Sequence, residues 1–230
     1  MPTAGLRAAL CPSLFLACGV AFAQVGASVA LLSDYRYRGI SLSDERPTLL
    51  LSAAYDDPGG WFGGGSLTEV MLYRPRWQVQ ALGYAGYASR LSDRFGWEAG
   101  VTGVHFGTDS RYDYYEVFAG LNGERWNMRA HYSPDYFGSG ARTVYGEFNV
   151  GVPLSALMRA TAHVGALMRV GGTRTEGANA SFDASLGAAL ARDAWEVQLA
   201  WVAGGRSAVY PTAYGRASRG ALVLSASLAF

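Results

Sequence analysis

The stretch "MRATAHVGA" (158–166) decides the fold class, because its side chains alternate between two kinds. Every second residue from Met158 to Ala166 is apolar, and the residues between them are Arg159, Thr161, His163 and Gly165. Successive side chains of a β-strand point to opposite faces, so the stretch predicts a strand with one apolar and one polar face. A soluble sandwich would bury the apolar face, whereas a transmembrane barrel would turn it to lipid.

The same two-residue period recurs along the chain. After the first two dozen residues, no apolar run is long enough to cross a bilayer as a helix. We predict twelve strands, which fall at residues 28–40, 47–56, 61–67, 76–88, 95–106, 112–122, 125–133, 143–152, 156–169, 180–191, 194–203 and 219–230. This number, in a chain of 230 residues, suits one antiparallel, up-and-down, transmembrane β-barrel.

The connections between these strands also alternate in length. Short ones carry tight-turn residues and lie at 56–60, 92–94, 122–125, 152–155 and 192–194. Longer ones lie between them, at 41–47, 68–75, 107–113, 133–142, 171–180 and 204–218. Bacterial outer-membrane barrels have short periplasmic turns and long outer loops, so this alternation favours a barrel over a sandwich.

The last strand adds a third sign, because an apolar face runs from Leu222 to the terminal Phe230. In a soluble protein such an edge would invite aggregation. In an outer-membrane barrel it resembles the terminal strand that the barrel-assembly machinery recognises. We therefore expect that machinery, outer-membrane lipid and lipopolysaccharide as partners of the chain.

The first 23 residues predict a cleaved signal peptide. Arg7 supplies the positive charge, residues 8–20 form the apolar stretch, and Ala21-Phe22-Ala23 is a small-x-small site ahead of Gln24. Residues 24–230 would then form the barrel, without cysteine. The alternative is a lipoprotein cleaved before Cys18, for which Phe15 is a poor residue three places upstream.

Charge argues against nucleic acid as a partner. The chain has no lysine, and its 19 basic residues are all arginine, against 18 acidic ones. Removing Arg7 would leave a formally neutral barrel, whereas nucleic-acid-binding proteins carry a basic patch.

The stretch "SDYRYRGIS" (33–41) lies in the first predicted strand, 28–40. If it is part of the wall, Tyr35 and Tyr37 face lipid or the outer interface. Asp34, Arg36 and Arg38 then face the interior. The expected partner of Arg36 is Asp34, two residues away on the same face, or acids that reach across the barrel.

Four stretches resemble the TorF-like porins, also called the Gcw_chp family of bacterial outer-membrane proteins. They are "VALLSDYRYRGISLSDERPTL" (29–49), "WEAGVTGVHFG" (97–107), "DYYEVFAGLN" (113–122) and "AHYSPDYFG" (130–138). The resemblance covers most of the chain from the first strand to about residue 150. It implies a channel-like protein of a Gram-negative outer membrane, with no catalytic residues and no cofactor.

Strand parity predicts which charged side chains line the interior: Asp34, Arg36, Arg38, Glu98, Glu116, Arg129, His131, Glu147, Arg159, His163, Asp183 and Glu196. They could pair with one another to offset the cost of burial, or bias which solutes pass. We expect Arg36 and Arg38 to help set selectivity by holding anions. A twelve-strand barrel has a backbone radius of about 12 Å, enough for ions and small solutes only. Small inward residues such as Gly100 and Gly120 indicate free space or room for large neighbours.

Two other functions stay open beside the channel. An enzyme could use His131, Ser133 and Asp135, but no nucleophile or zinc motif surrounds them. His131 and His163 lie two strands apart, about 10 Å, too far to share a metal alone. A structural or adhesive barrel would work through its loops, above all the arginine- and tyrosine-rich loop 204–218.

Overall fold

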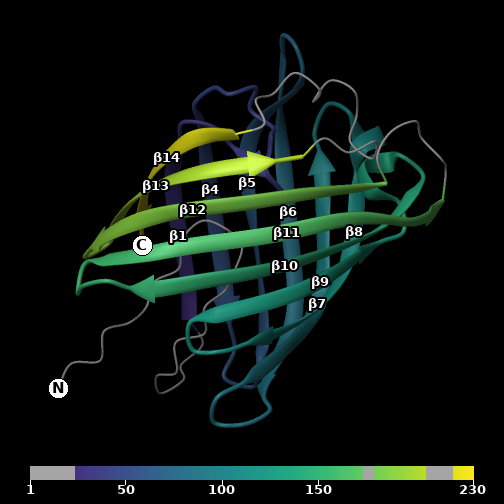
Figure 1. The fold of residues 1–230 in the computed structure, drawn as a ribbon. Helices are drawn as coiled ribbons and strands as arrows, with labels where there is room; N and C mark the ends of the chain where they lie inside the picture. The colour runs from purple at the N-terminus through teal and green to yellow at the C-terminus, as the bar shows by residue number, and fades with distance from the viewer. Residues whose placement is uncertain (1–23, 173–178, 206–219) are drawn as a thin grey trace.

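The protein is a closed antiparallel β-barrel in the computed structural model, which describes residues 24–172, 179–205 and 220–230 (Figure 1). Within these ranges twelve strands form the wall: β1 (Gln24–Leu32), β4 (Thr48–Asp56), β5 (Trp61–Tyr73), β6 (Arg76–Arg90), β7 (Gly96–Phe106), β8 (Tyr114–Asn122), β9 (Trp126–Ser133), β10 (Ala141–Pro153), β11 (Met158–Gly172), β12 (Ala180–Arg192), β13 (Trp195–Gly204) and β14 (Gly220–Ala229). The twelve-strand, up-and-down prediction is confirmed. The predicted signal peptide and most of the loops 171–180 and 204–218 lie outside the described residues.

Each wall strand pairs with its neighbour in the sequence, and β1 pairs with β14 to close the barrel. The short connections all lie at one end, which we call the short-turn end, together with the start of β1 and the end of β14. The other end is the long-loop end. Among the described residues, no helix is long and apolar enough to cross a membrane.

The first predicted strand is wrong in its second half. β1 runs from Gln24 to Leu32 and pairs with β4 over this whole length, and with β14 from Ser28 to Leu32. After Leu32 the chain leaves the wall, and it rejoins the wall at Thr48. The wall therefore does not include the stretch "SDYRYRGIS", although that stretch alternates as a strand would.

Residues 33–47, here called the inner segment, fold into the barrel. β2 (Arg36–Tyr37) and β3 (Ile40–Ser41) form a small hairpin, with Arg38 and Gly39 as its two-residue turn. Both turn residues have positive φ, +49° and +75°, which is typical of the tight turns that match the twist of a hairpin. The hairpin places Arg38 at the tip of the segment.

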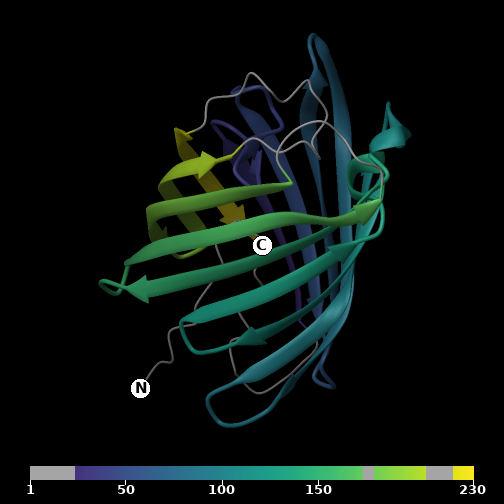
Figure 2. The ribbon, with the colours of Figure 1, turned by 45° about the vertical axis from the view of Figure 1, so that its right-hand side comes forward.

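The predicted loop 68–75 is also wrong, because β5 continues to Tyr73 and β6 starts at Arg76. Thr68 pairs with Gln80 and Glu69 with Val79 in the extended ladder. Figure 2 shows the tip of this hairpin rising past the ends of the neighbouring strands. Polar residues there signalled a loop, but the ladder continues to Val70 and resumes at Tyr73, opposite Arg76, after a register shift.

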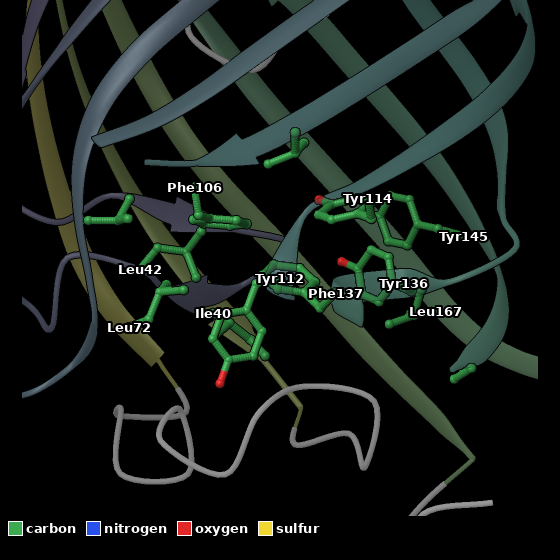
Figure 3. Packing of buried hydrophobic residues seen from close by; sticks show 13 residues of the cluster. Ile40, Leu42, Leu72, Phe106, Tyr112, Tyr114, Tyr136, Phe137, Tyr145 and Leu167 are labelled. Atoms are coloured by element: carbon green, nitrogen blue, oxygen red, sulfur yellow. The ribbon is translucent and has the colours of Figure 1, made fainter. Parts of the chain in front are cut away.

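A cluster of thirteen buried apolar side chains fills the long-loop end (Figure 3). This outer-end cluster consists of Ile40, Leu42, Val70, Leu72, Val104, Phe106, Tyr112, Tyr114, Tyr136, Phe137, Ala141, Tyr145 and Leu167. Two 3₁₀ turns, η1 (Ser110–Tyr112) and η2 (Tyr136–Gly138), contribute three of its rings. Burial raises the pKa of the Tyr112 hydroxyl above its ordinary value, so this group stays neutral beside Tyr73.

Tyr35 and Tyr37 pack against this cluster. The prediction that they face lipid is therefore wrong. The reason is the inward turn after Leu32, which carries both rings into the barrel. Their burial, with that of Ile40 and Leu42, stabilises the inner segment by removing apolar surface from water.

The outer surface of the wall is apolar. Leu186, Leu199 and Phe182 are 65%, 50% and 68% exposed, as strand parity predicts for the lipid side. A soluble protein rarely exposes so large a continuous apolar surface, whereas a bilayer solvates it.

Aromatic side chains gather near the short-turn end of this surface. Trp61 contacts Tyr87, and Tyr87 contacts Trp97, across β5, β6 and β7. Trp126 contacts both Phe95 and Phe148 farther round the barrel. Outer-membrane barrels carry such aromatic girdles at the membrane–water interface.

Candidate functional site

The twelve charged residues predicted for the interior lie together inside the barrel. Their side chains are at most 16% exposed. Nine belong to wall strands β7 to β13, and Asp34, Arg36 and Arg38 belong to the inner segment.

The base of the inner segment is held by Asp34 and Arg36. The Arg36 Nε donates to Asp34 Oδ2 at 2.6 Å, and its Nη1 donates to the Gly39 carbonyl at 3.1 Å. Asp34 Oδ1 accepts from the hydroxyls of Ser41 (2.6 Å) and Ser43 (3.1 Å). One carboxylate thus joins both strands of the hairpin, and its pairing with Arg36 is as predicted.

The tip of the inner segment is held by Arg38. Its Nη1 and Nη2 donate to the two Glu116 oxygens on β8, at 2.9 and 2.7 Å. The guanidinium also lies 3.9 Å from the ring centroid of Tyr145 and 5.2 Å from that of Tyr136. A planar, forked cation suits both contacts, which a lysine could not make together.

Gly39, next to Arg38, lies against the opposite wall. A Cβ added there would come within 2.7 Å of the Ala203 carbonyl and within 2.8 Å of Asp183 Cβ. The inner segment therefore contacts β8 and β10 on one side and β12 and β13 on the other. It spans the interior at the long-loop end.

Two further ion pairs lie between wall strands. Arg129 on β9 contacts Glu98 on β7 through its Nε. Arg159 on β11 donates through Nη2 to both oxygens of Glu196 on β13, at 2.8 and 2.7 Å. In each pair the partners lie two strands apart, so their side chains reach across the strand between them.

Polar side chains connect β10, β11 and β12. His163 contacts Asn149 through Nδ1 and Asp183 through Nε2, each at 2.7 Å. The Tyr145 hydroxyl donates to Asp183 at 3.1 Å. Asn149 and Tyr145 were absent from the predicted set, because a period of two does not reveal which uncharged inward residues join a polar network.

His131 lies between two carboxylates. Its Nδ1 is 3.5 Å from Glu116 Oε2, and its Nε2 is 3.7 Å from Glu147 Oε1. Ser133 donates instead to the Tyr115 carbonyl, and Asp135 accepts from the Gly140 amide. The three candidates for an enzyme site are therefore not brought together.

Some small inward residues make room for large neighbours. A Cβ added to Gly100 would lie 2.6 Å from Phe118 Cζ, and one on Gly120 would lie 2.8 Å from Arg129 Cγ. These glycines let the larger side chains lie flat along the wall. Within the described ranges, no group of three or more His, Cys, Asp or Glu is arranged to hold a metal.

Residues 17–228 match the family described as "Bacterial protein of unknown function (Gcw_chp)". The chain belongs to the Gcw_chp family. The resemblance read from the sequence is thereby confirmed over nearly the whole of this Gcw_chp protein. Among curated proteins, no sequence matches it.

Solved outer-membrane porins share the fold of this Gcw_chp protein. The NanC porin is 11% identical, with a TM-score of 0.60 over 90% of this chain and 99% of that one. The KdgM porin is 8% identical, with a TM-score of 0.57 over 90% and 98%. One KdgM structure is a complex with disordered oligogalacturonate. The closed barrel, the apolar exterior and this shared fold assign the chain to the bacterial outer membrane.

Proposed function

We propose that the protein is a narrow porin-like channel for ions and small hydrophilic solutes. The observation that carries the proposal is the interior: within a closed barrel, charged and polar side chains from seven consecutive wall strands face one another. Burying so many charges is costly unless they are paired or hydrated. Pairing meets part of this cost, and water along the interior would meet the rest.

The inner segment limits what such a channel could pass. It spans the long-loop end, and the outer-end cluster fills the space on the β5–β11 side with apolar side chains. A backbone radius of about 12 Å is thereby reduced to a much smaller bore. Small solutes fit this bore, whereas a folded protein does not.

A planar-bilayer recording of the refolded protein tests the proposal. The folded barrel, recognised by its faster migration on a gel before heating, should give discrete current steps in potassium chloride. The same sample, boiled before addition, is the control and should give none. Folded protein that inserts into the bilayer without current would contradict the channel.

A non-conducting structural barrel is the second candidate. The tight packing of the outer-end cluster favours it, because Leu42, Phe106 and Tyr136 have no exposed surface. Such a barrel would act through its loops, with lipopolysaccharide as a proposed contact. Bilayer recordings separate the two candidates, since only the channel carries current.

A further inference from the structure

We propose that the interior favours cations over anions and that Glu147 is the residue that determines this preference. The inference rests on the channel function proposed above and gives it a solute class, small cations.

The arginines of the interior are each engaged by a carboxylate. Arg36 contacts Asp34, Arg38 contacts Glu116, Arg129 contacts Glu98 and Arg159 contacts Glu196. Of the twelve interior residues, four are arginines and six are carboxylates. The two carboxylates outside these pairs are Glu147 and Asp183, and the basic side chains within 4 Å of them are His131 and His163.

The charge of Asp183 is compensated by close partners. It accepts from the Tyr145 hydroxyl and contacts His163 at 2.7 Å, and its side chain is 5% exposed beneath Gly39. A permeating ion therefore meets little of this carboxylate.

Glu147 is less well compensated than Asp183, and its side chain is more exposed. Its contact with His131 is 3.7 Å, longer than a hydrogen bond, and Arg129, opposite it in the β9–β10 ladder, contacts Glu98. Its side chain is 16% exposed, against 12% for Glu196, 6% for Asp34 and less for the other interior carboxylates. The most exposed basic side chain among the twelve residues is that of Arg159, at 14%. Among these twelve, the most accessible charge is thus a carboxylate. A carboxylate facing a narrow water path attracts cations and repels anions.

The sequence predicts that Arg36 and Arg38 help set selectivity, because spare donors on their guanidiniums would hold an anion. In the structure both guanidiniums serve the inner segment, and their side chains are 3% and 5% exposed. Through their contacts with Asp34 and Glu116, the two arginines stabilise the hairpin. The structure therefore favours the opposite sign of selectivity.

The test is the reversal potential in a gradient of potassium chloride at pH 8. The wild-type channel should be more permeable to potassium than to chloride. Glu147→Gln, which keeps the shape of the side chain, should bring the permeability ratio of the channels closer to one. Glu124→Gln removes the same charge from an exposed turn, where the side chain is 88% exposed, and should leave the ratio unchanged.

The other outcomes distinguish a failure of this inference from a failure of the channel function. A wild-type channel that prefers chloride, or a conducting Glu147→Gln channel with an unchanged ratio, would overturn the role of Glu147 and leave the channel standing. Folded protein without current would overturn the channel function and this inference with it. If Glu147→Gln fails to fold, Glu147→Asp keeps the charge and should restore both folding and preference; loss of preference there would also overturn the role.

Discussion

At the scale of single residues, Arg38 and Glu116 form a buried ion pair at the tip of the inner segment. The side chain of Arg38 is 5% exposed and that of Glu116 is 2% exposed, so each charge depends on the other for compensation. The desolvation of two such ions offsets much of their attraction, but removal of one partner leaves an uncompensated charge in a site with little water.

Arg38→Gln should therefore destabilise the folded barrel by about 3–5 kcal/mol, the usual cost of breaking a buried ion pair from one side. The double variant Arg38→Gln, Glu116→Gln should recover a large part of this loss, because no unpaired charge remains. Urea unfolding in lipid vesicles measures both. Equal stability of the wild type and the single variant would mean that water reaches the pair.

At the scale of elements, the sequence predicted the wall well and the inner segment poorly. All twelve wall strands follow from their alternation, because one face meets lipid along most of each strand. "SDYRYRGIS" alternates in the same way, yet its tyrosines bury against Phe106, Tyr136 and their neighbours instead of lipid. Alternation gives two faces but does not say what covers each. The signal for the hairpin was Arg38-Gly39, a pair whose glycine suits a turn with positive φ.

Replacing residues 34–43 with a short glycine–serine linker should increase single-channel conductance, because the inner segment spans the interior at the long-loop end. The strands β1 and β4 pair along their whole length without it, so the barrel should still fold. A deletion within the exposed turn 92–94 is the matched control and should leave conductance unchanged. Unchanged conductance after removal of the segment would place the narrowest point elsewhere.

At the scale of the whole molecule, the two faces of the wall meet different solvents. Strand parity predicted the nine charged residues that point inward from wall strands β7 to β13. Asp34, Arg36 and Arg38 lie in the interior for another reason, because the inner segment leaves the wall after Leu32. Strand parity did not predict which charged residues contact each other. The contact of Arg38 with Glu116, which are 78 residues apart, depends on where the inner segment enters the barrel.

Leu199→Arg should cost roughly 2–4 kcal/mol of folding free energy if the residue lies near mid-depth of the membrane, since it puts a charge on the lipid face. Thr161→Arg should cost much less, because Thr161 lies on the inner face, where its hydroxyl accepts from Gln198. Unfolding titrations in vesicles compare the two. Equal losses would contradict the assignment of the faces.

The seam between β1 and β14 has a consequence for how the two parts of the barrel depend on each other. The inner segment begins at Ser33, whose amide donates to the Leu224 carbonyl and whose hydroxyl accepts from the Leu224 amide. Leu224 lies in β14, so the first residue of the segment is fixed by the strand that closes the barrel on β1. Opening the seam would release this anchor as well. Closure of the wall and filling of the interior are thus coupled at Ser33.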